Sequence, residues 1–248
     1  MHVLENIYSA FGKRKLHFTL IDPDKQEPEG AGRIAFAAEG AGTDAIMVGG
    51  SGKISQELVD ETVRRIKERT PLPVILFPSG ASFLSRHADA ILFMSLLNSR
   101  NPKYLAREQA KAAPFVKRLG IEPIPMGYII VEPGMTVGRV GEADLVKRDE
   151  TKTAVGYAMA AQYFGMKIVY LEAGSGAPQP IPAEMISAVK SSIDVPLIVG
   201  GGIRDGESAT MVAKAGADII VTGRIVENSS DVLKMLKPII DAIHGSEK

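Results

Sequence analysis

Short apolar runs, each followed by a loop and then by an amphipathic stretch, recur along the chain. The runs are continuously apolar and rich in β-branched residues, a pattern typical of parallel strands that are buried on both faces. We predict strands at residues 16–21, 45–48, 73–77, 90–94, 122–131, 167–171, 196–199 and 218–222.

The amphipathic stretches between these runs carry apolar residues at the spacing of one helix face. Between residues 55 and 69, for example, Val59, Val63 and Ile66 fall on one side of a helix, with charged residues opposite. Helices are therefore predicted at 55–69, 102–119, 151–164, 182–192, 205–215 and 230–244. Eight strands alternating with helices in 248 residues favour a single (β/α)8 TIM-type barrel of the α/β class over an open sheet. We expect residues 1–248 to form one domain.

One internal repeat supports closure of the barrel. Residues 41–49 align with residues 215–223: in each segment a helix ends at a glycine, an aspartate precedes a strand, and a glycine follows it. The aspartates are Asp44 and Asp218. Because glycine is common at helix C-termini, convergence is the alternative to a shared βα unit.

Composition excludes several classes of function. The 29 basic residues balance the 29 acidic ones, so we expect no nucleic-acid partner. The absence of cysteine excludes disulfides, cysteine-ligated zinc and thiolate nucleophiles. No apolar run reaches the roughly 18 residues of an integral membrane span. The first residues lack the basic start and apolar core of a secretory signal, so we expect a cytoplasmic protein.

Glycine clusters follow the last two predicted strands, where barrel enzymes commonly bind phosphate. They are Gly200-Gly201-Gly202-Ile203-Arg204 and Thr222-Gly223-Arg224. Glycine lets backbone N–H groups approach an anion closely. These segments therefore predict a phosphate site; the alternative is that the glycines only form tight turns.

A carboxylate and a hydroxyl end the sixth predicted strand. Tyr170 and Glu172 are two residues apart, so they face the same side of a regular strand. Glu172 could take a proton from a substrate hydroxyl. Its alternative role is a salt bridge at the barrel rim. Glu132, after the fifth strand, is a weaker candidate of the same kind.

Hard oxygen ligands follow the first two strands. Asp22 and Asp24 flank Pro23, and Ser51 follows the second strand. These groups suit Mg²⁺, which usually takes one or two carboxylates plus phosphate oxygens and water. A hydrogen-bonded turn explains the same spacing, and the residues alone leave both open.

Two further groups of residues call for interpretation. The four histidines, His2, His17, His87 and His244, show no metal or triad spacing, so we interpret them as structural or solvated. The apolar segment 93–98 indicates either core or a groove for an apolar substrate.

Taken together, these motifs resemble the geranylgeranylglyceryl phosphate synthase family, which includes related bacterial heptaprenylglyceryl phosphate synthases. The resemblance covers essentially the whole chain. It rests on the segments Thr19-Leu20-Ile21-Asp22-Pro23-Asp24-Lys25, Met47-Val48-Gly49-Gly50-Ser51, Tyr170-Leu171-Glu172-Ala173-Gly174-Ser175-Gly176, Val199-Gly200-Gly201-Gly202-Ile203-Arg204 and Thr222-Gly223-Arg224.

The resemblance implies a prenyltransferase that moves a C20 group from its diphosphate to the 3-hydroxyl of sn-glycerol 1-phosphate. This step makes the first ether bond of archaeal membrane lipids. Asp22 and Ser51 match the family's Mg²⁺ positions, and Glu172 matches the glutamate that orients or deprotonates the hydroxyl, with Tyr170 beside it. The positions that match the glycerol phosphate site are Tyr170, Leu171, Glu172, Ala173, Gly174, Ser175, Gly176, Gly201, Gly202, Gly223 and Arg224.

Two departures suggest one particular branch of that family. Some members have a lysine where this chain has Leu20, and some have asparagine where it has Arg224. Dimers and hexamers both occur in the family, so we expect a homo-oligomer of unspecified size. A lipid product also raises the prospect of contact with a membrane.

Two other functions remain open from the sequence. One is a sugar-phosphate isomerase barrel, which needs an acid and a base on two strands; Asp22 could be one of them, but no obvious partner ends the fifth strand. The other is a non-catalytic phosphate-binding barrel. Retention of Asp22, Ser51 and Glu172 argues against the second.

Overall fold

Eight parallel strands close into a barrel in the computed structural model, which describes residues 2–50, 52, 54–227 and 231–246. Each strand pairs with the next in sequence, and β8 returns to β1 through the register Phe18 to Val221. The strands are β1 (Leu16–Ile21), β2 (Ala45–Gly49), β3 (Val74–Phe77), β4 (Ala90–Leu96), β5 (Glu122–Ile130), β6 (Ile168–Glu172), β7 (Leu197–Gly200) and β8 (Ile219–Thr222). The predicted barrel is confirmed, and the strand ends shift by no more than two residues from those predicted.

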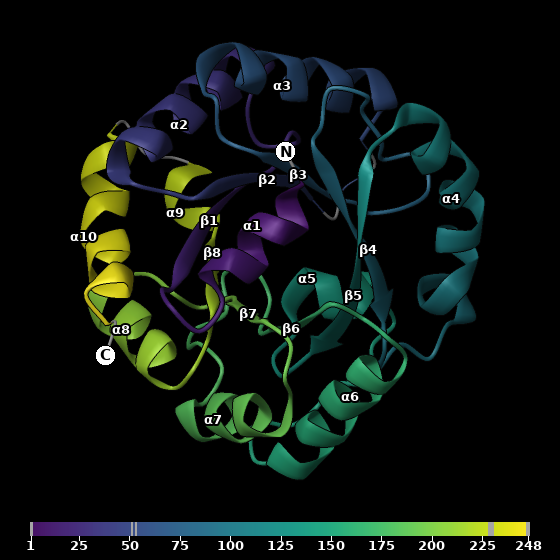
Figure 1. Ribbon diagram of the computed structural model, residues 1–248, viewed down its shortest axis with the longest axis vertical. Coiled ribbons are helices and arrows are strands. Elements are labelled where there is room, and N and C mark those ends of the chain that lie inside the picture. The colour runs from purple at the N-terminus through teal and green to yellow at the C-terminus, as the bar shows by residue number, and fades with distance from the viewer. Residues whose placement is uncertain (1, 51, 53, 228–230, 247–248) are drawn as a thin grey trace.

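An outer ring of helices surrounds the strands (Figure 1). It consists of α2 (Pro28–Ala41), α3 (Gln56–Arg69), α4 (Glu108–Leu119), α6 (Thr151–Tyr163), α7 (Ala183–Ser192), α8 (Gly206–Lys214) and α10 (Val232–His244). Shorter elements are α1 (Val3–Ala10), the π-helical turn η1 (Lys103–Arg107), α5 (Met135–Val140) and α9 (Arg224–Glu227). The six predicted helices are present, although the first turn of the predicted helix 102–119 is π-helical.

The sequence pattern did not predict α2, and the composition of its buried face explains why. That face consists of alanine and glycine, so it gives only a weak apolar periodicity. Small residues allow close packing: a Cβ on Gly32 would lie 3.0 Å from the backbone oxygen of Arg65 in α3. The two helices therefore approach closely through side chains that a hydrophobicity pattern underweights.

Residues 78–89, between β3 and β4, form no helix. Polar contacts with both neighbouring helices hold this segment. The Ser85 hydroxyl donates to Asp60 of α3 at 2.7 Å, and the Ala81 N–H donates to Glu108 of α4 at 2.9 Å. A loop therefore connects β3 to β4, whereas a helix joins every other pair of successive strands in the described part of the chain.

The repeated aspartates have a common structural role. Each precedes a strand and accepts the backbone N–H of the strand before it: Asp44 from His17 at 2.9 Å and Asp218 from Leu197 at 2.9 Å. Asp89 does the same for Val74 at 2.7 Å. These contacts fix the N-terminal ends of neighbouring strands relative to one another.

Helix α1 packs at this N-terminal end of the barrel, and Figure 1 shows it crossing the centre of the ring. Val3, Ile7 and Ala10 join the apolar cluster formed by the inward-facing strand residues. The Glu122 carboxylate at the start of β5 accepts the N–H of Val3 at 2.6 Å. This end of the barrel is thereby filled, and the opposite end remains available for a site.

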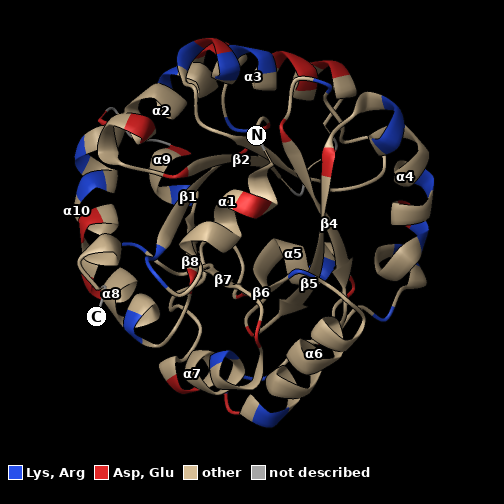
Figure 2. Ribbon diagram, viewed as in Figure 1, with Lys and Arg blue, Asp and Glu red and all other residues tan. Residues whose placement is uncertain are grey.

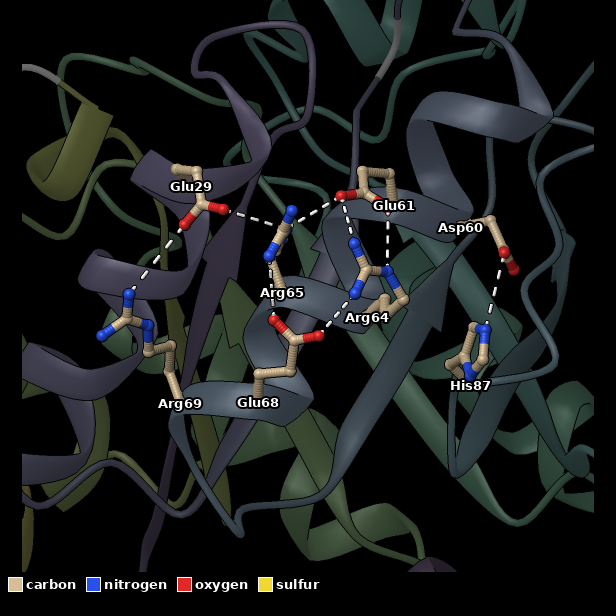
Figure 3. Close-up of polar contacts among 8 residues, drawn as sticks. All are labelled: Glu29, Asp60, Glu61, Arg64, Arg65, Glu68, Arg69 and His87. Atoms are coloured by element: carbon tan, nitrogen blue, oxygen red, sulfur yellow. Dashed lines mark hydrogen bonds and ion pairs between the residues drawn. The ribbon is translucent and has the colours of Figure 1, made fainter.

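Charged residues of both signs are interspersed along the outer helices (Figure 2). Arg65 of α3 illustrates this on the α2–α3 surface, where it pairs with Glu29, Glu61 and Glu68 (Figure 3). Among the described helices, none has the length and apolar character needed to cross a membrane.

Candidate active site

A cavity of about 710 Å³ opens at the C-terminal ends of the strands. Residues within or directly after all eight strands line it. This is the end at which barrel enzymes build their active sites. The geometry therefore brings together Asp22, Glu172 and the glycine loops that the sequence singled out.

Glu172 is the last residue of β6 and is buried against glycine. Its Oε1 atom accepts the N–H of Gly174 at 2.6 Å. A Cβ on Gly201 would lie 2.5 Å from the same oxygen, and a Cβ on Gly200 would lie 2.9 Å from Oε2. These positions must be glycine for the carboxylate to lie where it does.

Burial raises the pKa of Glu172, and the Gly174 N–H and the nearby hydroxyls of Tyr170 and Tyr128 oppose that rise. A buried carboxyl with a raised pKa binds a proton more readily than an exposed one. No described cationic side chain forms an ion pair with it. The rim salt bridge that was the alternative role of Glu172 is therefore absent from the described residues, and the carboxylate is available to a ligand.

Three aromatic rings lie beside this carboxylate and line the cavity. Tyr170 stacks on Phe77 at 5.7 Å between ring centroids and meets Tyr128 edge-on at 5.1 Å. The Tyr170 hydroxyl is buried and forms no hydrogen bond with any described protein atom. Burial and the charge of Glu172 raise the pKa of Tyr170 well above its ordinary value, so the hydroxyl keeps its proton. A buried donor without a partner indicates a place for a polar ligand.

Sequence reasoning missed Tyr128 and Phe77. Tyr128 is in register with Tyr170 on the neighbouring strand, so the two side chains point to the same side of the barrel wall. Tyr128 could have been found from the sequence, because it is a tyrosine near the C-terminal end of an otherwise apolar strand. Phe77 carried no such signal, because an aromatic residue in a buried strand usually belongs to the core.

The loop after β6 contributes Ser175 and Gly176 to the cavity lining. Gly174 has φ +99° and Gly176 has φ +80°, a conformation that favours glycine. Two predicted positions of this motif face elsewhere: the side chains of Leu171 and Ala173 are buried in the apolar cluster that includes α6 and α7 residues. Any role for these two positions in binding would be through the backbone.

The loops after β7 and β8 lie next to this one. Gly201 and Gly202 have φ +84° and +75°, and both line the cavity with Gly223 and Arg224. A Cβ on Gly176 would lie 1.8 Å from the Arg224 guanidinium. The predicted phosphate segments therefore meet at one side of the cavity, with an arginine across them.

Asp22 lines the cavity on the β1 side. A Cβ on Gly50, after β2, would lie 2.3 Å from its Oδ1 atom, so glycine makes room for the carboxylate there. Burial raises the pKa of Asp22, and the nearby carboxylates of Asp24 and Glu227 raise it further, against the Asp24 N–H and the charge of Lys25. Ser51, the other predicted metal ligand, lies outside the described residues.

The Asp22 carboxylate suits Mg²⁺ better than a metal ion whose ligands all come from protein side chains. Within the described part of the chain, no three His, Cys, Asp or Glu side chains gather as a metal site would require. Asp22 would therefore supply one oxygen ligand of an incomplete set. Mg²⁺ commonly completes its shell with water and substrate phosphate oxygens.

The other side of the cavity is apolar and extends past the end of β3. It is lined by Ile91, Phe93 and Leu96 of β4 and by Ala112 of α4. Ile91 belongs to the apolar cluster between strands and outer helices, and Leu96 to the cluster inside the barrel. The cavity thus passes from the barrel mouth to the outer face of β4, where residues 78–81 also line it. The groove expected at 93–98 is confirmed as cavity lining only for Phe93, Met94 and Leu96.

The remaining predicted residues lie away from the cavity. Glu132 follows β5 but is not among the lining residues. His17 is buried between the hydroxyls of Thr43 and Thr222, each 2.9 Å from a ring nitrogen, and burial lowers its pKa to about 3. None of the four histidines lines the cavity, in agreement with structural or solvated roles.

Comparison with known proteins identifies the family. A profile of the PcrB family matches residues 10–243. This chain belongs to the PcrB family. The geranylgeranylglyceryl phosphate synthase of Thermococcus gammatolerans is 58% identical over 239 residues, covering 96% of this chain and 95% of the relative. That of Thermoplasma volcanium is 53% identical, covering 100% and 98%.

Solved structures agree with this membership. A crystal structure of (S)-3-O-geranylgeranylglyceryl phosphate synthase from Thermoplasma acidophilum, in complex with the substrate sn-glycerol-1-phosphate, is 51% identical to this member of the PcrB family. Its TM-score is 0.96, with 99% of each chain covered. A thiamine phosphate pyrophosphorylase from Pyrococcus furiosus, 14% identical with a TM-score of 0.61 over 93% of this chain and 96% of that one, shares the fold alone.

Proposed function

We propose that this protein transfers a geranylgeranyl group from geranylgeranyl diphosphate to the 3-hydroxyl of sn-glycerol 1-phosphate. The observation that carries the proposal is the division of one cavity into a polar half, lined by glycine loops and arginine, and an apolar half along β4. A transferase of this kind needs both halves, because one substrate is small and anionic and the other has a long hydrocarbon chain.

The acceptor phosphate is assigned to the loops around Gly176, Gly201 and Gly223. Backbone N–H groups at glycines with positive φ can converge on an anion, and Arg224 supplies a positive charge beside them. A glycerol phosphate bound there would have its free hydroxyl groups directed toward Glu172 and Tyr170, which lie on β6 just before the first of these loops. The names of the relatives support this assignment of the acceptor.

Glu172 is assigned as the general base. As the bond forms between the acceptor oxygen and C1 of the prenyl group, the bond between C1 and the diphosphate oxygen breaks, and diphosphate leaves. The acceptor hydroxyl loses its proton to the Glu172 carboxylate. The raised pKa of Glu172 matches this task, and the buried Tyr170 hydroxyl beside it can donate a hydrogen bond that orients the acceptor.

The prenyl chain is assigned to the apolar half, along Ile91 and Phe93 and beside residues 78–81. The rings of Phe77, Tyr128 and Tyr170 lie where the two halves meet. Aromatic faces attract positive charge, so they would favour the charge that develops on the allylic carbon as diphosphate leaves.

Asp22 is assigned to hold Mg²⁺ with the diphosphate, together with Ser51. When bound, Mg²⁺ offsets negative charge on the leaving diphosphate. A sugar-phosphate isomerase would use the polar half of the cavity and leave the apolar half without a role. That apolar half favours the prenyltransferase.

The test is a transfer assay with labelled C15, C20 and longer prenyl diphosphates and sn-glycerol 1-phosphate, with Mg²⁺ or with excess chelator. We expect an ether-linked product with the C20 donor and a loss of turnover in chelator that added Mg²⁺ restores. Absence of product with every donor would contradict the proposed function. Full turnover in chelator would contradict only the role of Mg²⁺.

A further inference from the structure

Arg204, in the loop after β7, reaches across to the loop after β6. Its Nη2 atom donates to the backbone oxygen of Ala177 at 2.7 Å and lies 3.4 Å from that of Gly176. Arg204 also lines the cavity, beside Ser175 and Gly176. Arg204 belongs to the segment that predicts a phosphate site, but no role was predicted for its side chain.

The segment that Arg204 contacts is a tight turn. The Ala177 N–H donates to the Gly174 oxygen at 3.0 Å, which closes the turn around Ser175 and Gly176. Carbonyl oxygens carry partial negative charge, so a turn that directed them into the cavity would repel a phosphate. The guanidinium of Arg204 engages the last two carbonyls of the turn and so stabilises the conformation that leaves glycine facing the cavity.

The loops after β6, β7 and β8 are packed so closely that they have little room to move relative to one another. A Cβ on Gly202 would lie 2.3 Å from the backbone oxygen of Gln179, so the β7 loop lies directly on the β6 loop. Arg224 covers Gly176 from the β8 side. Arg204 thus supplies a side-chain link between the first two of three loops that meet at the phosphate end of the cavity.

We propose that Arg204 is a positioning residue for the acceptor phosphate: it holds the 174–177 turn in the conformation that binds the anion. This role rests on the proposed function, because it assigns the same end of the cavity to the phosphate of glycerol phosphate. It predicts a selective effect on acceptor affinity, since Arg204 contacts neither β4 nor the segment 78–89 through any described hydrogen bond.

The chain offers a matched control in Arg148. Its Nη2 atom also donates to a backbone oxygen of the β6 loop, that of Pro180, at 2.8 Å. Arg148 does not line the cavity. Loss of this contact removes one arginine–carbonyl bond from the same loop but leaves the 174–177 turn intact.

The experiment compares the wild-type chain with Arg204→Gln, Arg204→Lys and Arg148→Gln. Calorimetry measures the Kd for sn-glycerol 1-phosphate, and steady-state kinetics measure kcat and the KM for each substrate. We expect Arg204→Gln to raise the acceptor Kd and KM about tenfold, the order expected for one hydrogen bond to a charged group. The donor KM and the kcat at saturating acceptor should stay within about twofold, as for an interaction that binds ground state and transition state equally.

Arg204→Lys should lie between the wild type and Arg204→Gln, because an ammonium keeps the charge but loses the planar fork. Arg148→Gln should bind the acceptor like the wild type. An unchanged acceptor Kd in Arg204→Gln, or an equal loss in Arg148→Gln, would overturn the role of Arg204. A wild-type chain that neither binds glycerol phosphate nor forms product would instead overturn the proposed function.

Discussion

Replacement of Glu172 by glutamine isolates the proton-accepting role of this carboxylate. The change preserves size and keeps an oxygen that can accept the Gly174 N–H, which is 2.6 Å from Oε1. The glutamine amide also has an acceptor at hand, because the buried Tyr170 hydroxyl lies beside residue 172. Glutamine should therefore fit the same space between Gly200 and Gly201 without a cavity or a clash.

The magnitude follows from the loss of general-base catalysis. A positioned base typically contributes about 10²–10⁴-fold to the rate, so kcat for Glu172→Gln should fall by that factor, about 3–5 kcal/mol in activation free energy. The acceptor KM should change little, since the phosphate is assigned to the loops. The assay is transfer of a labelled geranylgeranyl group at saturating concentrations of both substrates.

Glu172→Gln should also increase the stability of the folded protein, and the pKa of Glu172 explains the direction of this change. Burial raises the pKa of Glu172 in the folded protein, so ionisation disfavours the folded state. As far as it depends on Glu172, the free energy of unfolding of the wild type is highest below the ordinary carboxyl pKa. It falls as the pH rises through the raised pKa of the folded protein. At pH 8 the variant should therefore melt at a higher temperature than the wild type, and this difference should vanish as the pH falls below the ordinary carboxyl pKa.

Glu132→Gln is the matched control, because Glu132 also follows a strand but does not line the cavity. It should retain wild-type turnover. Near-normal turnover of Glu172→Gln would refute the assignment of Glu172 as the base. A large loss in Glu132→Gln together with normal turnover in Glu172→Gln would assign the base to β5 instead.

Two further predictions concern glycine packing and the surface ion pairs. Gly200→Ala places a Cβ 2.3 Å from the Tyr170 hydroxyl, so turnover should fall about 100-fold as the site is displaced. Its control Gly156→Ala, which meets nothing within 4 Å, should keep full activity and gain about 0.5–1 kcal/mol of stability; equal activity of both variants would contradict the packing argument. Arg65→Met removes pairs to three glutamates (Figure 3) and should lower the melting temperature by about 2 °C in low salt. That loss should shrink in 1 M salt, and a loss independent of salt would point to packing of the side chain instead.

The barrel could be predicted from the sequence because buried parallel strands and their repeated connections leave strong patterns in it. Continuous apolar runs mark buried parallel strands, and Asp44 and Asp218 occupy the same place before β2 and before β8. Glu172 and Gly201 were also predictable, since strand ends in a barrel converge on one mouth. The structure confirms that these residues line or adjoin a single cavity.

Other features depend on contacts that no local pattern encodes. Residues 78–81 line part of the cavity and belong to a segment that forms no helix, and the lack of a helix leaves no periodic signal in the sequence. Tyr128 gains its importance from lying in register with Tyr170, which requires knowledge of strand pairing. Arg204 was visible in a glycine motif, but its contact with Ala177 joins two loops that are 27 residues apart in sequence.

A structure of the protein with both sn-glycerol 1-phosphate and an unreactive analogue of geranylgeranyl diphosphate tests the central claim most directly. The account predicts the acceptor phosphate between the loops at Gly176, Gly201 and Gly223, and its 3-hydroxyl within hydrogen-bonding distance of Glu172. It also predicts the hydrocarbon chain along Ile91 and Phe93, beside residues 78–81. A phosphate elsewhere in the cavity, or a chain that leaves the groove along β4 empty, would contradict it.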